Sequence, residues 1–124
     1  MASCNEHGVY DADEKLALPY PKKGWRGSPL ADISLADLGT HWIWATGYQM
    51  HSGNWEGAGS PLSDHEAWAE RRCASRAAAI AAASDYLRGR LQSRADGGDR
   101  DASAVCAWLD SLIPNQLDLF GAAA

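Results

Sequence analysis

Residues 41–50 alternate between two faces with a period of two, which predicts a β-strand. One face carries the larger side chains, namely Trp42, Trp44, Thr46, Tyr48 and Met50. An aromatic face of this kind can pack in a core or stack on nucleic-acid bases. Because few other large apolar residues precede residue 80, we favour the core for this face.

Three neighbouring segments have weaker patterns. A short apolar run over residues 33–38 predicts a partner strand, with Gly39 at the turn. Residues 51–63 are rich in glycine, asparagine and proline, which predicts a loop, or a loop with a short return strand around Trp55. The first 29 residues are polar and lack a sustained period, so they predict a flexible arm or an extended strand that covers the domain.

A helical period begins further along the chain. Residues 76–92 are dominated by alanine, and Cys73, Ile80 and Leu87 lie seven residues apart on one apolar stripe. An Asp-Gly-Gly-Asp sequence then breaks the pattern. A second helix is predicted over residues 102–112, where Pro114 ends it.

The start of the first helix has two alternatives. Ser63 and Glu66 form a capping-box pattern, which would give a helix of about 30 residues. Ser75 is the second candidate for the N-cap, and residues 68–73 would then form a strand. We favour Ser75, since a helix of that length is long for a small domain.

Together these elements predict an α+β fold. A short antiparallel sheet is packed by two helices, with a flexible or extended N-terminal arm over residues 1–29, a folded domain over residues 30–113 and a flexible tail over residues 114–124. A chain of 124 residues fits one domain.

Composition and charge limit the classes of protein to which this chain can belong. The net charge of −5 argues against binding nucleic acid with the whole surface. No apolar run reaches about 18 residues, so no membrane span is expected, and the start does not resemble a signal peptide. The three cysteines, Cys4, Cys73 and Cys106, are odd in number and widely spaced, which predicts free thiols in a reducing cytoplasm.

The most specific short motif is Gln116-Leu117-Asp118-Leu119-Phe120. Leu117, Leu119 and Phe120 supply apolar anchors, each worth roughly 1.5–3 kcal/mol when fully buried. Gln116 supplies an amide that can donate and accept hydrogen bonds at the edge of a pocket, while Asp118 can face solvent. The alternative is that the three apolar side chains fold back as a final strand that seals the core.

This pentapeptide resembles the peptide by which bacterial proteins bind the replication sliding clamp, the ring-shaped β subunit of DNA polymerase III. The resemblance covers five residues and implies a partner rather than an activity. Polymerases, mismatch-repair proteins, initiator regulators and small plasmid or phage proteins carry such peptides. The tryptophan-rich strand, the Gly-Ser-Pro-Leu-Ser turn and the alanine-rich helix after Ser75-Arg76 resemble small uncharacterised domains of bacterial mobile elements.

A second feature is a cluster of arginines. Six arginines and one acid, Asp85, lie between residues 71 and 94, a local excess of +5 (six charges less one) in an acidic chain. They could contact nucleic-acid phosphate or an acidic partner, or form a solvated face balanced by the acids of the arm. We favour the solvated face. The six are Arg71, Arg72, Arg76, Arg88, Arg90 and Arg94.

Patterns for metal binding and catalysis are incomplete. Cys4 and His7 have the spacing of a ligand pair, but no second pair follows, so neither a metal nor another cofactor is expected. The signatures of a zincin helix and of a nucleophile elbow both lack a required residue.

We therefore expect a non-enzymatic cytoplasmic protein that docks on the sliding clamp, where it recruits another protein or blocks the pocket, with weak DNA contact through the arginines. The alternative is a phage or mobile-element inhibitor of a host defence system, of anti-CRISPR or anti-restriction type, which small size and acidity fit. An enzyme would need a pocket in which His41, His51 or His65 lies beside a carboxylate. The sequence leaves the oligomeric state open.

Overall fold

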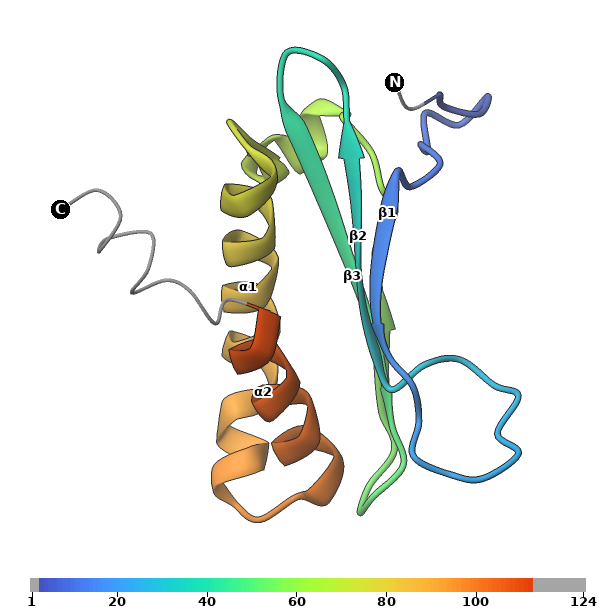
Figure 1. Cartoon of the computed structure of the whole chain (residues 1–124), viewed down its shortest axis with the longest axis vertical. Helices are drawn as coiled ribbons and strands as arrows, with labels where there is room; N and C mark the ends of the chain where they lie inside the picture. The colour runs from blue at the N-terminus through green and yellow to red at the C-terminus, as the bar shows by residue number, and fades with distance from the viewer. Residues whose placement is uncertain (1–2, 113–124) are drawn as a thin grey trace, which may run out of the picture.

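A five-stranded antiparallel sheet and two helices form two layers (Figure 1). In this computed structural model, residues 3–112 are described. Strands β1 (Glu14–Leu18), β2 (Ala31–Asp37), β3 (Trp42–Met50) and β4 (Glu56–Gly59) lie in sequence order, and the short β5 (Arg72–Cys73) also pairs with β3. A 3-10 helix, η1 (Glu66–Arg71), precedes α1 (Arg76–Asp96) and α2 (Arg100–Leu112). The predicted α+β class is confirmed.

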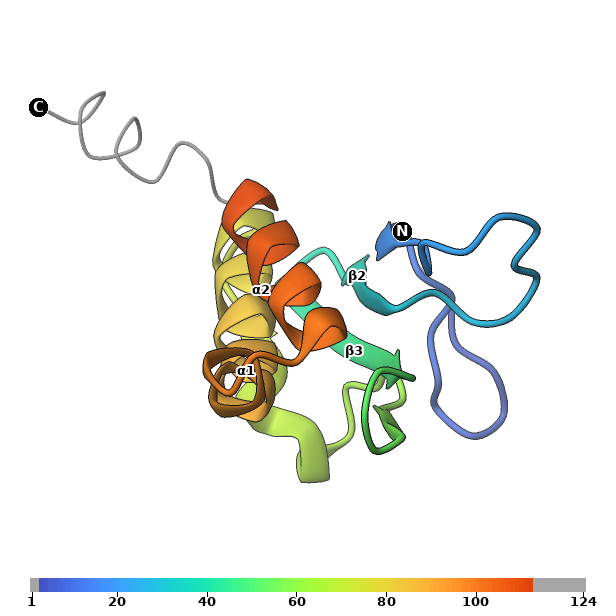
Figure 2. The ribbon, with the colours of Figure 1, turned by 90° about the horizontal axis from the view of Figure 1, so that it is seen from below.

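The main core lies between the sheet and the helices. Alternate residues of β2 and β3, such as Leu35 and Trp44, are directly paired and point towards the helices, where both are buried. They pack with Leu87 of α1 and Leu109 of α2, which lie on the same side of the sheet (Figure 2). The aromatic face of β3 is thus a core face, as the alternation predicts.

The opposite face of the sheet has a smaller apolar cluster at one end. Ala36, Ile43, Ala45 and Leu62 are buried there, with Tyr10 packed against them. The backbone N–H of Tyr10 donates to the carbonyl of Leu62 at 2.8 Å, which holds the N-terminal segment over this end. The other end of the same face has no such cover among the described residues.

The N-terminal segment contributes a strand to the sheet. Of the two alternatives for residues 1–29, the extended one holds over β1, which pairs antiparallel with β2 from Glu14 opposite Leu35 to Leu18 opposite Ala31. The folded domain therefore begins well before residue 30. The predicted return strand near Trp55 is β4.

Ser75 is the N-cap of α1, as favoured from the sequence, and its side chain accepts a hydrogen bond from the backbone N–H of Ala78 at 3.1 Å. The capping box at Ser63 and Glu66 does not start a long helix. The short η1 forms there instead, and the predicted strand over 68–73 shrinks to Arg72–Cys73. No helix within residues 3–112 is long and apolar enough to cross a membrane.

Replacing Ser75 with alanine should lower the free energy of unfolding by about 1 kcal/mol, because the N-cap hydroxyl is lost. Urea denaturation followed by circular dichroism measures this change. Ser93→Ala is the matched control, since Ser93 is exposed within α1. An equal loss in both variants would contradict the assignment of Ser75 as the cap.

Candidate functional site

The predicted partner-binding residues 116–120 lie outside the described residues, so the geometry of the domain bears on the arginines and on the remaining candidates. The six arginines come from η1, β5 and α1. They do not share one surface, and each has its own set of contacts.

Arg71 is buried in a cage of aromatic rings. Its guanidinium carbon lies 4.4 Å from the ring centroid of Trp44, 4.6 Å from that of Trp68 and 5.2 Å from that of Tyr86. Its side chain also donates to the hydroxyl of Ser60. With a residue exposure of 4%, Arg71 is part of the interior, where its charge is stabilised by cation–π contacts.

Arg72 is tied to a chain of polar groups at the β2–β3 turn. Its Nε donates to Oδ1 of Asp64 at 2.8 Å, and Nε2 of His41 lies 2.8 Å from the same oxygen. Burial alone would raise the pKa of Asp64, but hydrogen bonds from His41 and Arg72 outweigh it and lower the pKa. Nδ1 of His41 is 2.8 Å from the hydroxyl of Thr40.

This Thr40–His41–Asp64 series resembles the order of groups in a hydrolase, but two features oppose that role. Thr40 does not line the nearby hollow of about 440 Å³, which is formed by residues around Tyr10, Asp64 and His65. The carboxylate of Asp64 is also neutralised by Arg72. The series therefore anchors the β2–β3 turn to the segment before η1.

Two further arginines fasten α1 to other elements. Arg76 makes a bidentate pair with Glu14 of β1, with N···O distances of 2.7 and 2.6 Å, and this hydrogen bonding lowers the pKa of Glu14. Arg88 pairs with Asp110 of α2. Arg90 is exposed, and its Nε lies 3.4 Å from the hydroxyl of Tyr48.

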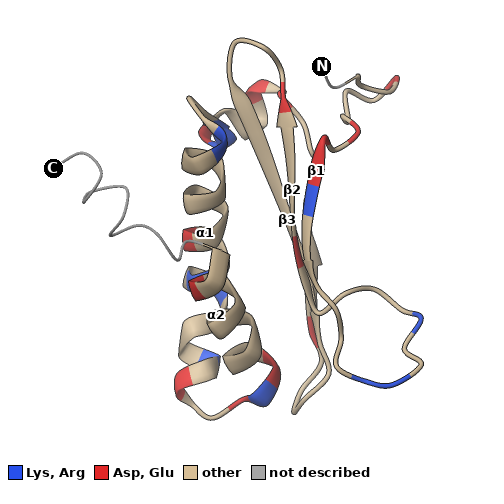
Figure 3. Ribbon diagram, viewed as in Figure 1, with Lys and Arg blue, Asp and Glu red and all other residues tan. Residues whose placement is uncertain are grey.

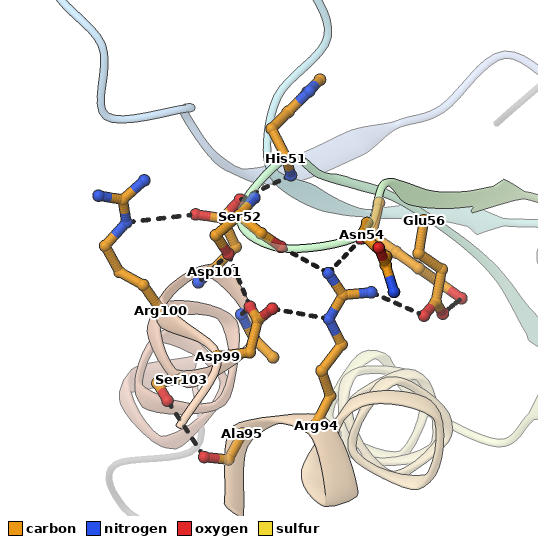
Figure 4. Close-up of polar contacts among 12 residues, drawn as sticks. His51, Ser52, Asn54, Glu56, Arg94, Ala95, Asp99, Arg100, Asp101 and Ser103 are labelled. Carbon is orange, nitrogen blue, oxygen red and sulfur yellow. Dashed lines mark hydrogen bonds and ion pairs between the residues drawn. The ribbon is translucent and has the colours of Figure 1, made fainter. Parts of the chain in front are cut away.

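Arg94 is the centre of the densest polar network (Figure 4). Its Nε donates to Asp99 at 2.8 Å and its Nη1 donates to Glu56 at 3.1 Å. Its Nη2 donates to the backbone carbonyls of Ser52 and Asn54. One guanidinium thus joins the end of α1, the start of α2 and the β3–β4 loop.

Two carboxylates complete this network. Asp99 precedes α2 and accepts from the N–H of Ala102 at 2.9 Å and from the hydroxyl of Ser52 at 2.8 Å. Burial raises its pKa, but these hydrogen bonds and Arg94 together lower it to about 2. Asp101 is buried and accepts from the backbone N–H groups of His51 and Ser52 at 2.7 and 2.9 Å.

The open cleft beside this network has a volume of about 820 Å³ and is lined by the loop at Ser52–Asn54 and by residues 97–100. The donors and acceptors of Arg94, Asp99 and Ser52 point at one another rather than at the cleft (Figure 4). The network joins elements of the fold to one another. Its acidic and basic groups are bonded to each other, so they offer no unpaired acid and base for catalysis. The sequence signal that could have found it is Asp99, an N-cap residue type directly before the second helix.

The histidines and cysteines considered as metal-binding or catalytic residues pack against other parts of the fold. His51 lies edge-on to Tyr20 and Trp25, with ring centroids 4.9 and 5.2 Å apart, and His65 caps η1. Cys106 is buried and Cys73 is half-buried. Among the described residues, no group of three His, Cys, Asp or Glu side chains could hold a metal ion.

Comparison of the chain with protein-family models, curated proteins and solved structures found no match.

Because the pKa of Asp99 is lowered in the fold, we expect Asp99→Asn to reduce the free energy of unfolding by an amount that depends on pH. A carboxyl with a pKa of about 2 when folded and 3.8 when unfolded stabilises the fold above pH 4, by about 2 kcal/mol. This contribution disappears as the pH falls from about 4 to 2, because the unfolded state binds the proton first. Asparagine keeps the capping oxygen, so the variant isolates the charge.

Urea denaturation between pH 7 and about pH 3 measures this difference. Asp85→Asn removes the same charge from an exposed position of α1 that makes no ion pair within residues 3–112, and it should change stability by less than about 0.5 kcal/mol. A loss for Asp99→Asn that stays constant from neutral to acid pH would contradict the assigned role of the Arg94–Asp99 pair.

Proposed function

We propose that this chain binds the bacterial replication sliding clamp in the cytoplasm through residues 116–120. The single observation that carries the proposal is the sequence Gln-Leu-Asp-Leu-Phe, with three apolar anchors and one amide in the order that such peptides use. Gln116 lies four residues beyond Leu112, the last residue of α2.

Few large hydrophobic side chains of the described residues are exposed. The main cluster is built from β1, β2, β3, α1 and α2. Of the large hydrophobic side chains in residues 3–112, only Trp55 and Tyr86 are exposed. Within residues 3–112, the exposed large apolar side chains therefore form no broad patch.

The body of the domain supports an accessory role. Its polar networks join elements of the fold, and its carboxylates are spread over the sheet, the loops and both helices (Figure 3). A DNA-mimicking inhibitor would gather acids in a stripe, so this distribution favours clamp binding over the anti-restriction alternative. On the clamp, the protein recruits a partner or blocks the pocket.

Titration of the full-length chain into purified clamp, followed by calorimetry, tests the proposal. We expect a micromolar dissociation constant, because ordering a peptide offsets part of the burial of its anchors. The double variant Leu119→Ala with Phe120→Ala should weaken binding at least about 100-fold, since two buried anchors are removed.

Asp118→Ser is the matched control, because serine fits between the two anchors as aspartate does and should preserve binding. The double variant should keep the circular dichroism and urea midpoint of the wild type. Equal affinity of the double variant and the wild type, or no binding by the wild type, would rule the proposal out.

A further inference from the structure

The face of the sheet away from the helices has two hollows at its uncovered end. One, of about 380 Å³, lies over Asp32, Gly47 and Gly59, which the strand register places side by side across β2, β3 and β4. The second, of about 460 Å³, lies beside Ala17 of β1, directly opposite Asp32. Pro29 lines both hollows, so the two hollows adjoin at this residue.

A tryptophan stands in each hollow. Trp55 has an exposure of 63% and its ring lies against Gly57, where a Cβ atom would come within 2.8 Å of the indole. Trp25 lies against Gly27 in the same manner, and its indole N–H donates to the carbonyl of Ser28 at 2.9 Å. Trp25 is half-buried, and its ring also packs against Tyr20 and His51, with centroids 4.6 and 5.2 Å away. Trp55 is therefore the more open of the two platforms. Rings that are held in place before a ligand arrives lower the entropy cost of stacking on them.

Positive charge without an acidic partner gathers at this face. The loop between β1 and β2 carries basic residues (Figure 3), and Lys15 of β1 points to the same face as Ala17. Within residues 3–112, none of these groups makes an ion pair, in contrast to most arginines of α1. The four basic residues are Lys15, Lys22, Lys23 and Arg26. The Nζ of Lys22 lies 5.9 Å from the ring centroid of Trp25.

Asp32 is an acidic group on a surface whose other charged side chains are basic. Its carboxylate is half-buried and receives no hydrogen bond from a described residue, and burial raises its pKa, with Lys15 acting in the opposite direction. A carboxylate repels phosphate but accepts hydrogen bonds from the amino groups of bases. A single strand of nucleic acid lying on this surface would place its phosphates along the β1–β2 loop and a base over Asp32.

We propose that this face binds single-stranded nucleic acid. Bases stack on Trp55 and Trp25, phosphates contact the four basic side chains, and Asp32 accepts from an exocyclic amino group. A double-stranded ligand cannot reach the rings, because its bases are already stacked. A cationic peptide would suit Asp32 and Trp55, but the four basic side chains would repel it.

Fluorescence anisotropy with labelled oligo-dC and oligo-dT of about 15 nucleotides tests the proposal on the full-length chain. We expect binding that weakens between about 50 and 200 mM salt, tighter for oligo-dC than for oligo-dT, and weaker for duplex DNA. Trp55→Ala should weaken binding roughly 5- to 100-fold. Lys22→Ala with Lys23→Ala should reduce the slope of log K against log salt by about 1.4, since each phosphate of a single strand contributes roughly 0.7.

Matched controls separate this face from the rest of the molecule. Tyr86→Ala removes the other exposed aromatic side chain, and it is compared on protein whose circular dichroism matches the wild type, because Tyr86 also contacts Arg71. Arg90→Ala with Arg100→Ala removes two charges elsewhere. Neither variant should change affinity by more than about twofold. Asp32→Ala, which removes the accepting oxygens, should abolish the preference for oligo-dC. Leu119→Ala with Phe120→Ala should bind DNA as the wild type does, so this test and the clamp test fail independently.

Absence of oligonucleotide binding at low salt would overturn the proposal, as would equal losses in the Trp55 and Tyr86 variants. Tighter binding of an oligo-arginine peptide than of either oligonucleotide would replace nucleic acid with a cationic partner. An equal gain for both oligonucleotides in Asp32→Ala would overturn the placement of a base over Asp32.

Discussion

The pairing of β2 with β3 sets the register on which the other strands and the core of the described domain depend. Its register places Leu35 opposite Trp44 on the face that packs against the helices, and Asp32 opposite Gly47 on the other face. β3 also pairs with β4 and β5, so three strands take their register from it. Because side chains alternate with a period of two, a slip of one residue would expose the aromatic core and bury Asp32.

The fold, rather than the order of residues along the chain, decides which charged side chains form ion pairs. Part of the local excess of +5 around α1 is paired with carboxylates that lie far away along the chain, as when Arg76 meets Glu14 across 62 residues and Arg94 meets Glu56 across 38. Lys22, Lys23 and Arg26 stand out less in the sequence and keep their charge available. Most basic side chains without an ion pair among the described residues therefore lie on strand β1 and the β1–β2 loop, while α1 keeps one of them, Arg90.

Local patterns were enough to predict elements whose cause is local. The strict alternation of β3, the alanine-rich stripe of α1 and the cap at Ser75 all depend on neighbours within a few residues. Patterns left alternatives open, or missed the outcome, where long-range pairing decides the structure. β1 is only five residues long within a polar segment, and it forms because β2 offers an edge and Arg76 holds Glu14. Arg71 lies beside other arginines in the sequence, yet it is buried because three aromatic rings from β3, η1 and α1 meet around it.

The two proposed contacts would reinforce each other because they use different parts of the chain. A surface with four basic side chains and two aromatic platforms would bind single strands weakly and lose affinity quickly as salt rises. A tail bound to a clamp that encircles DNA would hold this surface near its ligand, and tethering of this kind raises the effective concentration to the millimolar range. Occupancy would then depend on the clamp being loaded, so that a weak and unspecific contact gains its selectivity from the location that residues 116–120 provide.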